Sequence, residues 1–199
     1  MLVKVSTNNG KRMTAEQRRE QLLTLAAEEF AAAGLQGAST ELLAQRAEIS
    51  QAYIFRLFGT KKNLFLQVVD RSFSRLIDGM DQTAELTRGA QSLAVMGEYY
   101  NTRALTEHTD LLVQLQAFAA CGDPEVRDVV REHMARMWSS TADRTGLSPV
   151  GVKSFVAYGM LLNIAAALDI DEVDADWARG LRTRINTGLF DHLTAENNQ

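Results

Sequence analysis

The chain has 199 residues, which suffices for one large domain or two smaller ones that share a core. Hydrophobic residues make up 46% of it and aromatic residues 7%, a balance that excludes a disordered chain. Cys121 is the only cysteine, so a disulfide framework is excluded, and the net charge is −4. Residues 1–65 nevertheless carry nine Lys and Arg against six Glu, so this end can approach a polyanion, although uneven surface charge alone explains the same count.

The chain contains two prolines and little β-branched alternation, which predicts an all-α fold. Residues 1–13 are expected to form a flexible basic arm. Beyond them, capping residues and apolar residues at three- and four-residue steps predict about nine helices, over residues 14–34, 39–47, 50–58, 60–80, 90–104, 107–121, 124–145, 149–168 and 174–193. We expect these helices to divide into two parts, residues 14–62 with the first three helices and residues 63–199 with the others.

Local signals mark the helix ends at the N-terminus. Thr14 and Gln17 can satisfy each other's backbone amides, and Gly34 suits a left-handed stop. Ser39, Ser50 and Thr60 are expected to cap the next three helices.

The longest apolar stretch, Phe155 to Leu168, is too short to span a bilayer and contains Gly159 and Asn163. A soluble, cytoplasmic protein without a membrane partner is therefore expected.

Residues 39–58 predict two short helices joined by the turn Glu48-Ile49-Ser50. Apolar residues from both helices can hold them at a fixed angle, around a small core of Leu42, Leu43, Ala47, Ile49, Ile54 and Phe58. The second helix then exposes its other face, which is the geometry of a helix-turn-helix whose recognition helix enters the major groove. A plain helical hairpin explains the same pattern.

The stretch from Arg18 to Val69, RREQLLTLAAEEFAAAGLQGASTELLAQRAEISQAYIFRLFGTKKNLFLQVV, resembles the TetR family of transcription regulators. Its most specific part is LFGTKKNLF, and the family's characteristic residue types stand at Phe30, Gly34, Ala44, Ala47, Ile49, Ser50, Phe58, Lys61, Leu64 and Phe65. The resemblance covers about a quarter of the chain. It implies that residues 14–62 form a three-helix helix-turn-helix DNA-binding domain and residues 63–199 a helical ligand-binding and dimerisation domain. It also implies a homodimer, a small-molecule pocket in the remaining residues, and repression that a ligand releases.

Three residues depart from the family's pattern. Glu48 stands where the family usually has a turn glycine, and a left-handed backbone there costs about 1 kcal/mol. Phe55 replaces a common tyrosine and Leu57 another frequent aromatic residue, so the contacts with phosphate are expected to differ in detail.

We expect the protein to bind double-stranded DNA at an inverted-repeat operator. Gln51 can pair with adenine, and Lys61 lies at a helix N-terminus, where amides and lysine together attract phosphate. The expected DNA-contacting residues are Thr40, Ser50, Gln51, Ala52, Tyr53, Phe55, Arg56 and Lys61. The alternative for each is a solvated or packing side chain.

The predicted helix 149–168 is apolar nearly all round, so it must be buried on two sides. One side can meet its own domain and the other a second copy of the chain. The expected dimer interface consists of Phe155, Gly159, Leu162, Ala166, Trp177, Leu181, Ile185 and Leu189. A deep monomeric core is the alternative.

Methionine, aromatic and amide side chains in the remaining helices predict a pocket for an apolar or aromatic effector. The expected lining residues are Met96, Tyr99, Tyr100, Gln114, Phe118, Met134, Met137, Trp138, Tyr158 and Asn163, although ordinary core packing explains such residues as well. The three histidines are scattered and no catalytic motif is visible, so no metal, cofactor or enzymatic activity is expected. Two other functions stay open, an all-helical ligand-binding protein or enzyme and a purely structural helical dimer.

Overall fold

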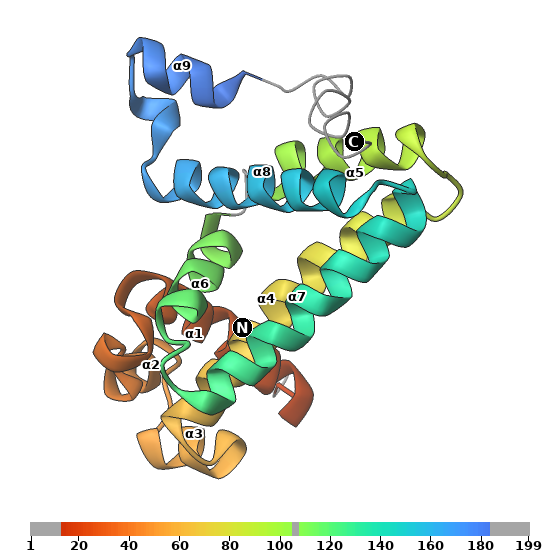
Figure 1. The fold of residues 1–199 in the computed structure, drawn as a ribbon. Helices are drawn as coiled ribbons and strands as arrows, with labels where there is room; N and C mark the ends of the chain where they lie inside the picture. Colours follow the sequence, from red (N-terminus) through yellow and green to blue (C-terminus); the bar gives the residue numbers. More distant parts are fainter. Residues whose placement is uncertain (1–12, 105–107, 184–199) are drawn as a thin grey trace, which may run out of the picture.

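The computed structural model describes residues 13–104 and 108–183, and these residues form an array of helices (Figure 1). The elements in chain order are α1 (Ala15–Gly37), α2 (Thr40–Arg46), α3 (Gln51–Phe58), α4 (Lys61–Thr83), α5 (Ala90–Tyr99), the π-helical turn η1 (Tyr100–Ala104), α6 (His108–Ala119), α7 (Pro124–Thr145), α8 (Pro149–Ala167), the 3-10 turn η2 (Ile170–Glu172) and α9 (Asp176–Arg182). The expected all-α class is confirmed. The N-terminal arm and the end of the predicted helix 174–193 lie outside the described residues.

Helices α1, α2 and α3 form what we call the N-terminal unit. The predicted capping residues stand at the starts of these helices and of α4. Thr14 Oγ1 accepts a hydrogen bond from the Gln17 amide at 3.1 Å, and Gln17 Oε1 accepts one from the Thr14 amide at 2.9 Å. The side chains of Ser39, Ser50 and Thr60 accept from the third residue of the helix that each of them caps. These bonds are local in sequence, which explains why the helix starts could be predicted.

The small core between α2 and α3 forms as predicted with one exception. Leu43, Ala47, Ile54 and Phe58 are buried, whereas Leu42 is 45% exposed. Successive residues of a helix point about 100° apart, so Leu42 and Leu43 cannot both face the same core. The expectation for Leu42 was therefore wrong.

The long helices α4 and α7 lie side by side and run in the same direction (Figure 1). Three contacts between them advance together along both helices: Lys62 with Asp123 at 3.4 Å, Asp70 with His133 at 3.0 Å, and Asp81 with Arg144 at 2.9 Å. Since α4 begins at the N-terminal unit, these contacts attach that unit to the rest of the molecule.

Helix α8 begins near the far end of α7, runs away from it, and packs on α6 and α7 (Figure 1). It has 19 residues, long and apolar enough to cross a membrane by length and composition, and 39% of its most apolar window is buried inside this one chain. This finding corrects the expectation that no apolar stretch reaches that length. The helix begins at Pro149, six residues before the run that the sequence singled out.

The structure also corrects the face of α8 that was expected to meet a second copy. Phe155, Leu162 and Ala166 are buried within their own chain. Its exposed apolar residues lie on the opposite side, at Ala157, Leu161, Ile164 and Leu168. A helix that is apolar all round has no polar face from which its orientation can be read, so the sequence did not distinguish the two sides.

The other residues expected at that interface have mixed positions. Gly159 faces inward, because a Cβ there would lie 3.4 Å from the ring of Tyr100. Trp177 is exposed and Leu181 is partly buried. Ile185 and Leu189 lie outside the described residues.

Candidate nucleic-acid interface and internal cavity

Helix α3 lies at one end of the molecule, with α1 and α2 behind it (Figure 1). Ile54 and Phe58 anchor it in the core. Its outer face presents Gln51, Ala52, Phe55 and Arg56, which are all exposed and were all predicted as DNA contacts. Tyr53, also predicted, is partly buried.

The structure joins two of the predicted contacts to each other. Gln51 Nε2 donates a hydrogen bond to Thr40 Oγ1 at 2.7 Å. Thr40 itself is buried, so in this structure it supports Gln51 rather than presenting its hydroxyl to the surface. Gln51 Oε1 is left as the acceptor that can face a base edge.

Two further predicted residues form a pair on the same helix. The Arg56 guanidinium lies over the Tyr53 ring, 4.5 Å from the ring centroid. A cation held over an aromatic face is oriented at little cost in side-chain entropy. Ser50, the residue before α3, is exposed and its hydroxyl accepts from the Tyr53 amide at 3.3 Å.

Lys61 is the first residue of α4, as predicted, but its ammonium group is engaged within the protein. Nζ donates to the carbonyl oxygens of Gln36 and Ala38, at 3.0 and 3.1 Å. These carbonyls end α1, so Lys61 caps that helix. An ammonium group has three N–H donors, and the third is available to a phosphate.

The turn between α2 and α3 contains the strained residue that the sequence anticipated. Glu48 has φ of 55°, in the left-handed region, and its amide donates to the Gln45 carbonyl at 3.1 Å. The expected cost of about 1 kcal/mol for a non-glycine residue therefore applies at this position.

Several basic residues of the N-terminal end form ion pairs with carboxylates of the same chain. Arg46 pairs with Glu28, and Lys62 pairs with Asp123, the N-cap of α7, and with Glu125 in its first turn. The charge count of the sequence therefore overstates the positive field that this end presents to solvent.

An internal cavity lies between α4, η1, α6, α7 and α8. It has a volume of about 20 Å³, measured as the space open to the centre of a water molecule. That is room for about one water, so a larger ligand must displace side chains. The lining residues are Phe73, Met80, Tyr100, Gln114, Phe118, Met134, Met137, Phe155, Val156, Gly159, Met160 and Asn163.

Six of the ten predicted pocket residues line this cavity: Tyr100, Gln114, Phe118, Met134, Met137 and Asn163. The other four, Met96, Tyr99, Trp138 and Tyr158, do not, and Trp138 is an exposed side chain. The sequence missed Phe73, Met80, Val156 and Met160, and it assigned Phe155 and Gly159 to the dimer interface. Residue type alone could not separate lining residues from core residues that pack elsewhere.

Three polar side chains of the cavity form one chain of hydrogen bonds. The Tyr100 hydroxyl donates to Asn163 Oδ1 at 2.5 Å, and Asn163 Nδ2 donates to Gln114 Oε1 at 3.1 Å. All three residues are buried. Burial raises the pKa of Tyr100 well above its ordinary value, so its phenol stays protonated and donates.

Tyr100 begins the π-helical turn that follows α5. Asn101 Nδ2 and Thr102 Oγ1 donate to the carbonyls four residues back, at Gly97 and Glu98, with distances of 2.8 and 2.6 Å. Such side-chain bonds compete with regular helical geometry. The predicted helix 90–104 thus changes its winding at the residue whose hydroxyl reaches the cavity.

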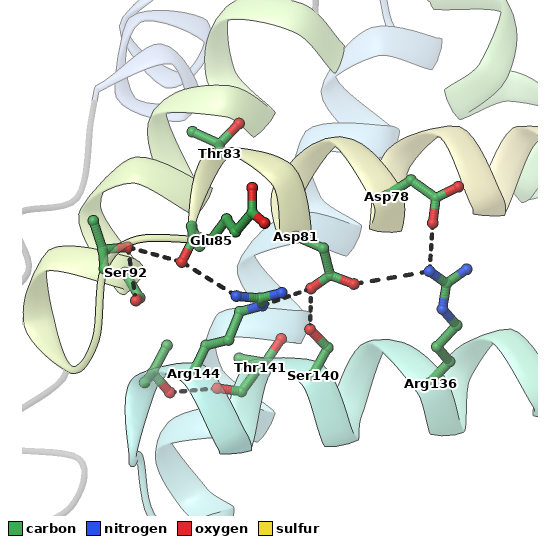
Figure 2. Close-up of polar contacts among 12 residues, drawn as sticks. Asp78, Asp81, Thr83, Glu85, Ser92, Arg136, Ser140, Thr141 and Arg144 are labelled. Atoms are coloured by element: carbon green, nitrogen blue, oxygen red, sulfur yellow. Dashed lines mark hydrogen bonds and ion pairs between the residues drawn. The ribbon is translucent and has the colours of Figure 1, made fainter.

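Figure 2 shows a group of charged residues that joins the far ends of α4 and α7. Asp81 of α4 accepts from Arg144 Nε at 2.9 Å and from the Ser140 hydroxyl, and Arg136 pairs with Asp78. We call Asp78, Asp81, Arg136, Ser140 and Arg144 the α4–α7 clamp. It holds α4 at the end opposite the N-terminal unit.

Comparisons with known proteins agree with this geometry. Residues 22–68 match the family model of bacterial regulatory proteins, tetR family. The HTH-type transcriptional activator FasR of Mycolicibacterium smegmatis is 33% identical over 78 residues, which are 39% of this chain and 36% of that protein. The chain thus matches little more than a third of the length of this curated relative.

Two solved structures share the fold over nearly the whole chain. A TetR-like transcriptional regulator from Rhodococcus sp. RHA1 has a TM-score of 0.70 at 19% identity, with 94% of this chain and 100% of that chain covered. The regulator FadR from Bacillus subtilis, in complex with stearoyl-CoA, has a TM-score of 0.67 at 15% identity, with 88% and 97% covered. Identities this low show a common fold and nothing more.

Proposed function

Because residues 22–68 match the family model of bacterial regulatory proteins, tetR family, we propose that the chain is a regulator of this family, which acts on transcription as a DNA-binding homodimer controlled by a small molecule. The observation that carries the proposal is α3, which is anchored in the core and exposes Gln51, Ala52, Phe55 and Arg56 at the end of the molecule. A helix that is anchored on one side and exposed on the other has the dimensions to enter the major groove.

On this surface, different residues contact the DNA bases and the DNA phosphates. Gln51 faces the base edges, and its bond to Thr40 leaves Oε1 to accept from an exocyclic amine such as that of adenine. Arg56 and the third N–H of Lys61 provide charge for phosphates, which position the protein without reading sequence.

The dimer is proposed to form through the exposed apolar stripe of α8, which consists of Ala157, Leu161, Ile164 and Leu168. Ile164 is 45% and Leu168 52% exposed in the single chain, and burying such side chains is favourable. Helix α8 lies toward the end of the molecule away from α3 (Figure 1). A two-fold dimer of this kind presents two reading helices side by side, so its operator is an inverted repeat.

We propose repression as the direct effect on transcription. A dimer that occupies two successive major grooves excludes other proteins from that DNA. The relative from Mycolicibacterium smegmatis carries the name of an activator, so the position of the operator relative to the promoter decides the outcome. In a reporter whose operator overlaps the transcription start, expression should fall when the protein is made. An unchanged or raised expression there contradicts repression.

Selection from random DNA duplexes tests the DNA-binding function. The protein should enrich an inverted repeat, and Gln51→Ala should weaken binding to the enriched duplex by about 1–3 kcal/mol per half-site, with little change on scrambled DNA. Gln82→Ala, an exposed substitution near the other end of α4, is the matched control. A wild-type protein that enriches no sequence, or that binds enriched and scrambled duplexes equally, contradicts the proposal.

A further inference from the structure

The hydrogen bonds inside the cavity have a direction that leaves a donor at one end. Tyr100 donates to Asn163, and Asn163 donates to Gln114. Gln114 accepts through Oε1, so its Nε2 group ends the chain. That nitrogen is buried and has no partner among the described residues, and Gln114 as a whole is 2% exposed.

A buried amide without an acceptor is costly, because the group gives up its hydrogen bonds to water and gains none in return. Gln114 lines the cavity, so the acceptor that completes its bonding can come from a molecule inside that space. The pairing of Asn163 with Gln114 also keeps the Gln114 amide in its present orientation.

The rest of the lining restricts what such a molecule can be. None of the residues that line the cavity carries a charge, so a charged ligand group would be buried without a partner. Four lining residues are methionines (Met80, Met134, Met137 and Met160), whose unbranched side chains rearrange easily. Phe73, Phe118 and Phe155 offer ring surfaces to the same space. Met134, Val156 and Met160 are only partly buried, so they separate the cavity from solvent.

We propose that the effector is a small, neutral and mainly apolar molecule with one hydrogen-bond acceptor oxygen, which accepts from Gln114 Nε2. This inference rests on the proposed function, since it names the ligand class of the regulator's own cavity. The cavity of about 20 Å³ is its closed form, and the ligand enlarges it by displacing the methionines. A carboxylate, or the phosphates of an acyl-CoA, would find no partner among these lining residues.

Three probes of similar shape separate the elements of this proposal. Acetophenone is neutral and has a carbonyl acceptor, α-methylstyrene replaces that oxygen by a methylene group, and benzoate carries a charge. We expect wild-type protein to bind acetophenone at least about tenfold more tightly than α-methylstyrene in calorimetric titrations, and to show no binding of benzoate. The alkene is the more apolar molecule, so general hydrophobic binding would give the opposite order.

Gln114→Leu removes the donor and should bring the affinities of the ketone and the alkene to within about twofold of each other. Gln82→Leu, on an exposed face of α4, should keep the wild-type preference. The wild-type comparison does not depend on the folding of any variant. Equal or stronger binding of the alkene by wild type overturns the proposal. So do binding of benzoate, a preference that persists in Gln114→Leu, and a failure of wild type to bind any of the three probes.

Titration of the enriched duplex separates this inference from the function on which it rests. Acetophenone should weaken the binding of wild-type protein to that duplex, and α-methylstyrene should do so only at higher concentration. Wild-type protein that binds the duplex but shows no preference for the ketone contradicts the ligand class alone. Protein that prefers the ketone but binds no duplex contradicts the regulatory function and leaves the cavity chemistry standing.

Discussion

Gly34 and Glu48 both adopt positive φ, at 65° and 55°. Gly34 interrupts α1 close to its end, and Glu48 lies in the turn between α2 and α3. Their surroundings differ. At Gly34 ψ is −178°, a combination that is essentially restricted to glycine, and Gln116 of α6 lies directly against it. The Gln116 amide donates to the Ala31 carbonyl at 3.3 Å, so a side chain of the rear half completes the end of α1. Single residues thus attach the N-terminal unit to the rest of the fold.

Gly34→Ala should lower the free energy of unfolding by about 2 kcal/mol or more. The backbone angles alone cost about 1–3 kcal/mol for a residue with a Cβ. That Cβ would also lie 2.6 Å from Gln116 Oε1, so Gln116 would have to move. Gly97→Ala in α5 is the control, because its Cβ would meet nothing within 4 Å. Urea denaturation measures both, and equal stabilities for the two variants would contradict this reading of Gly34.

Tyr100 should make the protein less stable at alkaline pH. Burial raises the pKa of Tyr100 in the folded state. The stability that its protonated phenol contributes is therefore fully present below the unfolded-state pKa of about 10, and it is lost as the pH rises from there toward the folded-state pKa. Between about pH 9 and about pH 10.7 the wild type should lose about 1 kcal/mol more than Tyr100→Phe, which cannot ionise there. Urea midpoints of both proteins at the two pH values check this. Parallel losses would show that Tyr100 ionises as an exposed phenol does.

Helices α4 and α7 form the rigid pair that connects the two ends of the molecule. Lys62, Asp70 and Asp81 of α4 each meet a residue of α7 or of its N-terminal cap. The α4–α7 clamp, drawn in Figure 2, closes this series at the C-terminal ends of both helices. Both the cavity and the reading unit contact α4, so a ligand that displaces Phe73 or Met80 pushes directly on the helix that carries Lys61.

Asp81→Ala should destabilise the protein by about 1–2 kcal/mol, because Arg144 and Ser140 lose a partly buried acceptor. Asp128→Ala is the matched control. Asp128 is 72% exposed and pairs with Arg131 at 3.5 Å, and such exposed pairs contribute about 0–1 kcal/mol. Thermal unfolding of both variants compares the two carboxylates. A loss at Asp81 no larger than that at Asp128 would mean that the clamp contributes little to stability.

Ile164→Asp should convert the dimer into a monomer that keeps its helical content. The substitution places a charge in the proposed interface without touching the core of the single chain. Leu162→Asp, two residues earlier and buried, should instead unfold the protein. Light scattering and circular dichroism distinguish the two outcomes. If Ile164→Asp stays dimeric, the second copy binds elsewhere on the molecule.

The whole molecule has its proposed DNA surface at one end and its proposed dimer surface at the other, with the cavity between them (Figure 1). Small changes in the packing of α4, α6 and α8 around the cavity therefore alter the spacing of two α3 helices in a dimer. An inverted repeat has a set spacing, so such a change weakens binding at both half-sites together. Ligand and DNA then oppose each other reciprocally, as linkage requires.

Lys61→Ala should flatten the dependence of log K on log salt by about 1.8 units, since each lost phosphate contact accounts for about 0.9 and a dimer loses two. The substitution should weaken binding to the enriched and to the scrambled duplex alike. Lys61 also caps α1, so the free energy of unfolding is measured beside the titrations. Arg88→Ala, exposed beyond the far end of α4, should leave the slope unchanged. An unchanged slope for Lys61→Ala would leave Lys61 with its capping role alone.

The sequence by itself determined the helix starts, the turn between α2 and α3 and the exposed face of the reading helix. These features depend on residues a few positions apart. Thr14 bonds to Gln17, Ser50 bonds to Tyr53, and the spacing of Ile54 and Phe58 orients α3. A capping bond or a helical period forms within one or two turns, so a short stretch of sequence contains everything that specifies it.

Only the tertiary structure decided which side of α8 faces inward, which residues line the cavity and where Lys61 donates. Leu162 and Leu161 have the same residue type and differ only in which neighbouring helices they meet. Gln114 and Asn163 are 49 positions apart in the sequence and share a hydrogen bond because α6 packs on α8. Apolar and amide side chains make these contacts through burial and mutual position, and neither of these exists until the helices have assembled.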